Sequence, residues 1–317
     1  MRLLPYSTPG NLFMALEHRA KYWEEGVHYA AVSYVHGDMS ERKPITLAGR
    51  SFMITEGLYD ALAAIHARGG GDRWFWIDQL CINHQNLAEK NAQVAQMSVI
   101  YASADQVVAW LRPEVDSIAN GQAKAGTQAE VEEVAVQGGE ADSNGTLKVD
   151  MSAVAHNLYW QRAWTRVEAL RARRLAVMYG QHVINNDKLQ HLYSSASEQD
   201  QPFKTLLQRI LGSESDTCNE QMGPSEILHQ VLGEYSVCSS SNVLDRVFAM
   251  LNDPRLEKLP SARRPRIDYG ITAAELVSGL TVWHDEWLTY EYMTKSVQQA
   301  SLDFSRLASN ALDTALG

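Results

Sequence analysis

Three short apolar runs separated by amphipathic segments constrain the fold of the first 111 residues more than any other feature. The runs are YAAVSYVHGD at 29–38, WFWIDQLCI at 74–82 and QVVAWL at 106–111. Each has the length and composition of a strand buried within a sheet. The segments between them are long enough for helices. This alternation of strand and helix predicts an α/β fold with a parallel sheet.

Local signals place the elements between these runs. Residues 45–54 (ITLAGRSFMI) predict a short hairpin around an Ala-Gly-Arg turn. Thr55 can cap a helix whose apolar face carries Leu58, Leu62 and Ile65. Asn86 and Glu89 resemble a capping box at the start of the next helix, in which Leu87, Val94, Met97 and Tyr101 share one side.

The segment 113–150 interrupts this order. From Glu114 to Asp150 the sequence has eight acidic residues, two lysines and no aromatic residue. A segment of low hydrophobicity and high net charge gains little from burial, so we expect a mobile inserted loop. A docking segment for a partner is the alternative.

Predicted secondary structure resumes at residue 155. Trp160, Trp164 and Val167 lie near one face of a predicted helix there. VMYGQHVI follows as a strand or hairpin, and the pattern from residue 202 onward is helical. We therefore expect an α/β domain over 1–190, with the acidic insert inside it. Residues 191–317 are expected to form a helical portion packed on that domain.

The composition of the chain argues against several classes of function. The chain has 28 Lys and Arg against 38 Asp and Glu, a net charge of −10, which argues against nucleic acid as a partner. No apolar run reaches the roughly 18–20 residues of a membrane span. Three widely spaced cysteines form neither a disulfide framework nor a metal motif, so we expect a cytoplasmic protein without a bound metal.

Four blocks of the sequence resemble the fungal heterokaryon-incompatibility (HET) domain, in the family's order. YAAVSYVHGD at 29–38 is similar to Y-x-A-L-S-Y-x-W-G-D, and WIDQLCINHQNLAEKNAQVAQMSVIY opens a long match over 76–111. YWQRAWTRVEAL at 159–170 is similar to Y-x-x-R-x-W-x-x-Q-E. LDRVFAML at 244–251 and IDYG at 267–270 form the weaker fourth block.

The resemblance implies a fold and a chemistry. HET domains look like distant relatives of Toll/interleukin-receptor (TIR) domains, which have a flavodoxin-like parallel sheet flanked by helices. Several TIR domains cleave NAD with a helical glutamate preceded by a tryptophan, and Trp164 and Glu168 match that element. NAD is thus the candidate substrate, and no other cofactor is implied.

Ligands of open α/β sheets bind beyond the carboxyl ends of the strands. Two such ends hold the candidate substrate-binding residues Ser33, Tyr34, Gly37, Asp78 and Asn83, to which the resemblance adds Trp164. The candidate catalytic residues are Glu168, His36 and His84. His36 stands where the family has Trp, and His84 where it has Gln. Arg166 and Val167 replace the family's aliphatic-Gln pair.

Structural roles remain open for several of these residues. Glu168 could form a surface ion pair with Arg171, and Asp78 could pair with an arginine or with backbone amides. The resemblance implies a role in incompatibility or regulated cell death, through self-association or a fungal protein partner. The alternative is an enzyme of fungal secondary metabolism that binds a small molecule in the cleft and uses the histidines for acid–base chemistry.

Overall fold

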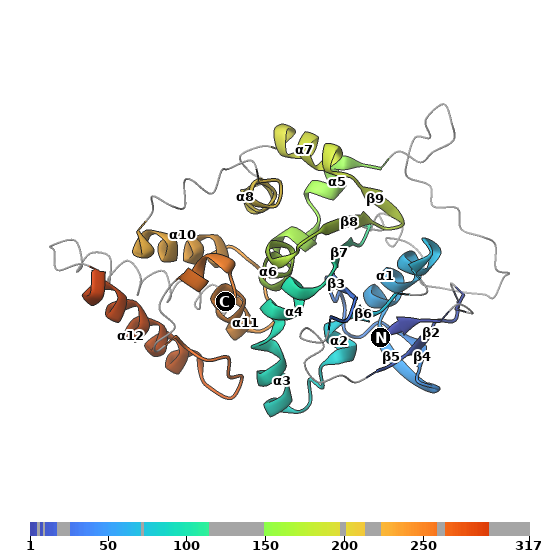
Figure 1. The fold of residues 1–317 in the computed structure, drawn as a ribbon, viewed down its shortest axis with the longest axis horizontal. Helices are drawn as coiled ribbons and strands as arrows, with labels where there is room; N and C mark the ends of the chain where they lie inside the picture. The colour runs from blue at the N-terminus through green and yellow to red at the C-terminus, as the bar shows by residue number, and fades with distance from the viewer. Residues whose placement is uncertain are drawn as a thin grey trace, which may run out of the picture.

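The computed structural model describes residues 1–4, 7–8, 10–17, 26–70, 73–113, 149–196, 201–212, 223–258 and 264–291. Two β-sheets and the helices around them form successive layers (Figure 1). Most of the predicted acidic insert, residues 114–148, lies outside the described residues.

The larger sheet confirms the predicted parallel α/β fold. Its strands, in spatial order, are β6 (Phe75–Trp76), β3 (Ala30–Tyr34), β7 (Gln106–Leu111), β8 (Leu175–Tyr179) and β9 (His182–Ile184). The first four are parallel, and β9 pairs antiparallel with β8 as the predicted hairpin. Numbered along the chain, the order is 2-1-3-4-5, which is the flavodoxin-like order. The direction of winding reverses between β3 and β7.

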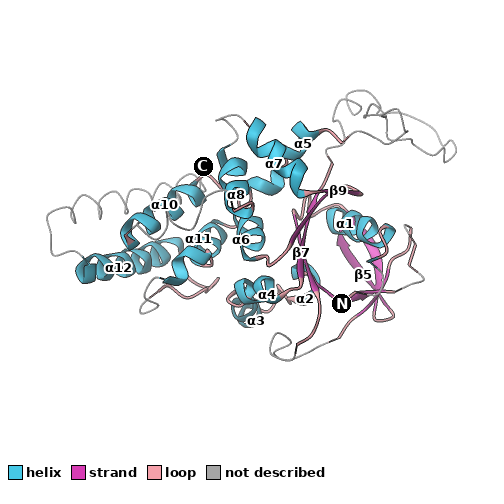
Figure 2. Cartoon of the chain, turned by 45° about the horizontal axis from the view of Figure 1, so that its top comes forward, coloured by secondary structure: helices cyan, strands magenta, loops and turns pink. Residues whose placement is uncertain are grey.

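A second sheet lies beyond helix α1 (Glu56–Ala67). It consists of β1 (Arg2–Leu3), β2 (Phe13–Ala15), β4 (Arg42–Leu47) and β5 (Arg50–Thr55). Strands β4 and β5 form the predicted hairpin, and both turn residues, Ala48 and Gly49, have positive φ angles, as a two-residue type I′ turn requires. Thr55 caps α1, as predicted. Helix α1 lies between the two sheets and fills the core that they share (Figure 2).

The run at 74–82 is not one continuous strand, contrary to the prediction. Only Phe75 and Trp76 pair with β3, and Asp78–Cys81 form the short helix α2. The amides of Cys81 and Ile82 donate to the carbonyls of Ile77 and Asp78, in the helical pattern. An apolar run has no periodicity, so it cannot distinguish a buried strand from a buried helical turn.

The helix predicted after Asn86 is two helices, α3 (Leu87–Val94) and α4 (Met97–Ser103). Asn86 caps α3 by accepting from the Glu89 amide at 3.1 Å. The Glu89 carboxylate accepts from the amide of Asn83. The break between the helices separates Leu87, which is 49% exposed, from the buried face of α4.

The chain from residue 149 onward is mainly helical apart from β8 and β9, as predicted. The remaining helices are α5 (Met151–Ala155), η3 (Leu158–Gln161), α6 (Ala163–Arg171), α7 (Asn186–Ser195), α8 (Gln201–Ile210), α10 (Pro224–Ser236), α11 (Val243–Leu251), η5 (Pro254–Lys258) and α12 (Ala273–Glu291). Figure 2 shows α10, α11 and α12 beyond α6, on the side away from the sheet. The domain boundary at residue 190 stays a prediction.

Helix α6 joins the sheet to the C-terminal helices. Its residues Ala163 and Val167 belong to the same buried cluster as residues of α10, α11 and α12. Arg166 pairs with Glu234 of α10, which also accepts from Arg255 at 2.7 Å. Arg255 in turn donates to the fully buried Asp253 at 2.9 Å. This buried ion network holds the helical portion against α6.

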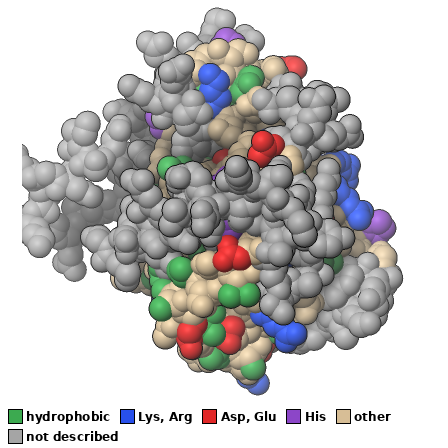
Figure 3. Space-filling model, turned by 90° about the vertical axis from the view of Figure 1, so that its left-hand side faces the viewer, with side chains coloured by type: hydrophobic (Ala, Val, Ile, Leu, Met, Phe, Trp, Pro, Cys, Tyr) green, Lys and Arg blue, Asp and Glu red, His purple; other side chains and the backbone are tan. Residues whose placement is uncertain are grey.

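Among the described helices, none is both long and apolar enough to span a bilayer. On the face at the α12 end, hydrophobic, acidic and basic side chains are interspersed wherever described residues are visible (Figure 3).

The ion network predicts a large cost for removing its central carboxylate. Glu234→Ala leaves the buried Arg166 and Arg255 without this partner, so we expect the free energy of unfolding to fall by about 3–5 kcal/mol. Glu257→Ala is the matched control, because Glu257 is 59% exposed in its pair with Arg171 and should cost about 1 kcal/mol or less. Urea denaturation of both variants measures the difference, and equal losses would contradict this account.

Candidate functional site

The candidate site lies where β3 ends, beside the point at which the direction of winding reverses. Ser33 and Tyr34 are the last residues of β3, and His36 and Gly37 follow. Gly37 has a φ of 70°, so the chain turns sharply there. A Cβ atom on Gly37 would lie 3.7 Å from the guanidinium of Arg112, which follows β7. The loops after β3 and β7 therefore converge at the sheet edge where α/β proteins bind ligands.

A buried acid lies on one face of β3. Glu168 projects from α6 and is only 5% exposed, and its Oε2 accepts a hydrogen bond from the Ser33 hydroxyl. The same hydroxyl hydrogen-bonds the phenol of Tyr159 at 2.7 Å. Tyr101 of α4 donates to the Val32 carbonyl at 3.2 Å nearby. Helix α6, helix α4 and η3 thus enclose the carboxyl group against the strand.

This environment changes the protonation of Glu168. Burial, followed by the negative charge of Asp78, raises the pKa of its carboxyl group to about 8. Hydrogen bonds from Ser33 and Tyr101, together with the charge of His36, oppose the shift. Glu168 is consequently a neutral acid between about pH 4.5 and about pH 8, where an ordinary glutamate is ionised.

An ion pair lies beside the buried acid. The Nε2 atom of His36 is 2.9 Å from Oδ2 of Asp78, and Oδ1 of Asp78 accepts from the Gln79 amide at 2.7 Å. Burial alone would raise the pKa of Asp78, but the charge and hydrogen bond of His36 outweigh it and lower that pKa. Burial likewise opposes the positive charge of His36, but Asp78 raises the pKa of the imidazole overall. The ring of Tyr34 lies 5.0 Å from that of His36.

The site therefore shifts the pKa values of its two carboxyl groups in opposite directions. It lowers the pKa of Asp78 and raises the pKa of Glu168. Such a separation assigns different chemical roles to two neighbouring acids, because one stays charged while the other can give up a proton. Within the described part of the chain, no three His, Cys, Asp or Glu side chains are arranged to hold a metal ion. The arrangement is suited to proton transfer and to stabilising positive charge.

The structure brings most of the predicted residues together. Ser33 and Glu168 share a hydrogen bond, and His36 pairs with Asp78. His84 reaches the same place from the next loop, with its Nε2 atom 3.3 Å from the carbonyl oxygen of Asp78. The buried hydroxyl of Tyr34 makes no hydrogen bond to the described residues, but it lies close enough to Asp78 for that charge, together with burial, to raise its pKa.

Two predicted residues lie apart from this group. The backbone amide of Asn83 donates to Glu89, and its side chain accepts from the Gln85 amide, so Asn83 shapes the loop before α3. Trp164 is partly buried and packs against two core clusters, one formed mainly by α10, α11 and α12 and the other containing residues of α4.

The structure excludes the alternative of a surface ion pair for Glu168 and places Arg166 away from the site. Glu168 forms no surface ion pair with Arg171, because Arg171 instead binds the Asn252 carbonyl and Glu257. Arg166 replaces a residue of a family motif but does not line the site. It points to Glu234 on the opposite side of the helix.

Sequence reasoning missed Tyr159 and Tyr101, which complete the enclosure of Glu168. Tyr159 is the first residue of the block YWQRAWTRVEAL, so its place in the same motif as Glu168 could have indicated that it belongs to the site. Tyr101 was assigned only to the apolar side of a helix. An aromatic periodicity does not reveal which hydroxyl will meet a buried acid.

The second and fourth blocks of the family resemblance meet in space. The Asn91 side chain of α3 donates to Asp268 at 2.9 Å and accepts from the Tyr269 amide at 3.0 Å. The Lys90 ammonium lies 3.4 Å from the ring centroid of Tyr269. The IDYG segment therefore anchors the C-terminal helical portion on the α/β domain.

These features define an α/β domain with a flavodoxin-like strand order and an acid pair at its carboxyl edge. Residues 29–168 match the family model described as "Heterokaryon incompatibility protein (HET)". Heterokaryon incompatibility protein 6, OR allele, of Neurospora crassa is 41% identical over 100 residues. That match covers 28% of this chain and 15% of the relative, so the chain spans a small part of that protein's length. No solved structure matches the chain.

The protonation of Glu168 predicts a pH-dependent stability. Its pKa is raised in the folded state, so its contribution to stability is fully present below about pH 4.5 and is lost as the pH rises through about 8. Gln has nearly the shape of the neutral acid and does not ionise. The free energy of unfolding of Glu168→Gln, measured relative to the wild type, should therefore increase from pH 5 to pH 8.5. A constant difference would show that Glu168 titrates normally.

The ion pair predicts a measurable change at His36. Asp78→Asn removes the charge that raises the pKa of the imidazole, so that pKa should fall. Titration of the His36 ring protons by NMR measures the change. Asp38→Asn is the control, because Asp38 lies two residues from His36 but hydrogen-bonds Ser40. A fall of equal size in both variants would contradict a specific pair.

Proposed function

We propose that this protein acts in heterokaryon incompatibility, as a cytoplasmic HET-domain protein that triggers regulated cell death. The proposal is supported by the HET domain at 29–168 and by the partial match to the Neurospora crassa incompatibility protein. In this proposal the domain is activated by association with a second copy or with a fungal protein partner.

We further propose that the chemical step is hydrolysis of NAD. The observation that carries this proposal is the position of Glu168, which is enclosed beside the end of β3 where two strand-end loops converge. In this reaction the bond between C1′ of the ribose and the nicotinamide nitrogen breaks, and nicotinamide leaves with the bonding electrons. Water adds to C1′ and loses a proton. An ionised carboxylate near the ribose stabilises the positive charge that develops on the sugar.

The neighbouring groups have definite roles in this proposal. Asp78 remains ionised and adds a second negative charge near the reaction centre, while His36 is held by it as an acid–base group. Arg112 follows β7. Its Nη2 atom pairs with Glu56 at 2.6 Å, while its Nη1 atom lies on the side of Gly37, where it can face a phosphate of the dinucleotide. Because Glu168 must lose its proton to act, NAD hydrolysis should increase as the pH rises towards about 8.

The deciding measurement is nicotinamide release from NAD, by the wild type and by Glu168→Gln. We expect the wild type to release nicotinamide when it is concentrated or tethered into oligomers, and the variant to lose at least about a hundredfold of that rate. Glu257→Ala is the matched control, since it removes an exposed glutamate that pairs only with Arg171 among the described residues. Circular dichroism verifies folding. Equal turnover by the wild type and Glu168→Gln would remove Glu168 from the mechanism.

A second candidate is an enzyme that acts on another small molecule, as in fungal secondary metabolism. The His36–Asp78 pair favours it, because a histidine held by a carboxylate is a general acid–base arrangement that is not specific to NAD. Absence of NAD turnover in the tethered wild type would shift support to this candidate or to a HET domain that signals by association alone.

A further inference from the structure

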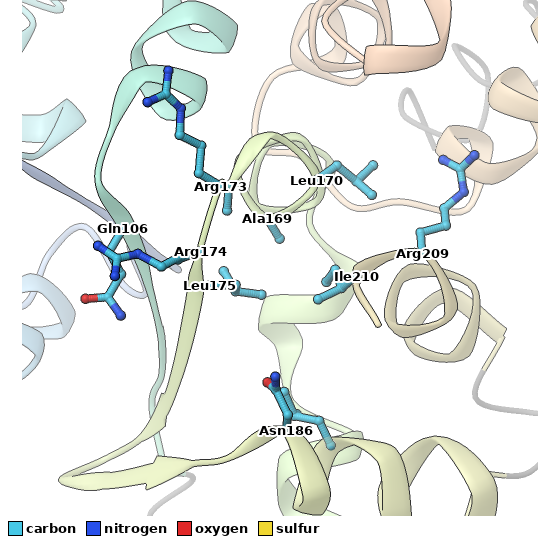
Figure 4. A pocket seen from close by; sticks show the side chains of 11 residues that line it. Gln106, Ala169, Leu170, Arg173, Arg174, Leu175, Asn186, Arg209 and Ile210 are labelled. Carbon is cyan, nitrogen blue, oxygen red and sulfur yellow. The ribbon is translucent and has the colours of Figure 1, made fainter. Parts of the chain in front are cut away.

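A cavity of about 480 Å³ opens between α6, α7, α8 and the start of β8. Apolar side chains such as Leu175 and Ile210 form part of its wall. Figure 4 shows the guanidinium groups of Arg173, Arg174 and Arg209 directed away from one another. The arginines of this cavity therefore do not form a converging set of polar groups like those that fix a bound small molecule.

Strand β5 is an open edge of the smaller sheet. It is the last strand in the order β1-β2-β4-β5 and is six residues long. The other edge strands among the described residues, β1, β6 and β9, have only two or three residues each. Arg2 of β1 and Trp74, which directly precedes β6, also bridge to each other. Strand β5 is thus the longest edge that the described sheets present.

The pairing with β4 establishes which backbone groups of β5 point outward. Opposite residues of an antiparallel pair alternate between hydrogen-bonded and non-hydrogen-bonded pairs. Thr46 lies opposite Ser51 but donates its amide to Leu12 on its other side, so Thr46 and Ser51 form a non-hydrogen-bonded pair. Met53 lies opposite Pro44, which has no amide hydrogen to donate. The backbone N–H and C=O groups of Ser51 and Met53 therefore point away from β4, along the open edge.

The open part of the edge, residues 51–53, is not protected by its own sequence. Edge strands commonly resist pairing because they carry Pro, Lys or a bulge. Strand β5 contains neither Pro nor Lys, and its single charged residue, Arg50, lies next to the turn. Phe52 and Met53 are 46% and 47% exposed. Only beyond them is the edge closed, where the Thr55 amide donates to the Gln79 side chain at 3.4 Å.

We propose that β5 pairs antiparallel with β5 of a second copy of this chain, which joins the two smaller sheets into one. Ser51 of each copy pairs with Met53 of the other, and each such pair exchanges both of its N–H···O bonds. Phe52 then meets Phe52 of the second copy at the two-fold axis. The proposal rests on the self-association in the proposed function and names the surface that this association uses.

A second copy fits this edge because the strand is complementary to itself, as a two-fold interface requires. The two Phe52 residues form a non-hydrogen-bonded pair, in which opposite side chains approach most closely, and aromatic pairs at such positions stabilise a sheet. Arg50 of one copy lies opposite Ile54 of the other and diagonal to its Glu56. Charges across the interface are therefore of opposite sign.

Cysteine cross-linking of the whole protein tests this register. Opposite residues in a non-hydrogen-bonded pair have Cα atoms about 4.5 Å apart, within the range of a disulfide. Phe52→Cys should therefore form a covalent dimer under mild oxidation, visible on a non-reducing gel and lost on reduction. Arg50→Cys is the matched control, because its two copies would lie about 13 Å apart along the strands, too far for a disulfide. The wild type, oxidised in parallel, accounts for the native cysteines.

A second variant tests the backbone pairing. Met53→Pro removes an outward amide hydrogen but no hydrogen bond to β4, so the fold should persist by circular dichroism. We expect it to weaken self-association, measured by analytical ultracentrifugation, at least about tenfold. Combined with Phe52→Cys, it should abolish the cross-link.

The outcomes separate this interface from the rest of the proposed function. Equal cross-linking of Phe52→Cys and Arg50→Cys, or self-association that Met53→Pro leaves unchanged, would overturn the β5 interface but not self-association. A wild type that stays monomeric at all concentrations would overturn both. Nicotinamide release does not enter either measurement, so its failure would count against NAD hydrolysis alone.

Discussion

Two buried polar contacts on opposite sides of α6 determine how the sheet and the C-terminal helices are arranged. Arg166 and Glu168 are two residues apart on the helix, so their side chains point about 200° apart. Glu168 meets Ser33 on the sheet, and Arg166 meets Glu234 on α10. Both contacts are buried, and a buried charged or polar group without a partner is costly. The position of the sheet relative to the C-terminal helices is therefore specified from both sides of one short helix.

The chemistry of the site follows from the same burial. Had Glu168 been exposed, it would be an ordinary ionised glutamate, but between β3, α4 and η3 its pKa is raised to about 8. Asp78 is also enclosed, yet His36 and the Gln79 amide keep it ionised. Neighbouring acids with opposite pKa shifts give this site a neutral acid beside a charged ion pair. This difference in protonation between Glu168 and Asp78 is the physical reason for proposing a catalytic role for the site.

The predictions that held were those with a local cause. Thr55 accepts a hydrogen bond from the Leu58 amide in α1, and the β4–β5 hairpin turns at Ala48 and Gly49. The run at 74–82 failed as a strand because burial on all sides removes the periodicity that distinguishes strand from helix. Arg166 belongs to the same sequence block as Glu168 but faces α10, because a position in a motif does not state which side of a helix faces the site.

The sequence by itself determined the order of strands and helices, the parallel sheet, and the convergence of Ser33, His36 and Asp78 near strand ends. These follow from spacing along the chain and from the rule that parallel strands end at one edge. Only the tertiary structure decided that Tyr159 and Tyr101 enclose Glu168, and that Glu234 forms ion pairs with both Arg166 and Arg255. Arg166 and Glu234 are 68 residues apart, and Ser33 and Tyr159 are 126 residues apart. Such partners are selected by packing, and a pKa depends on that packing, so neither is encoded in a short segment.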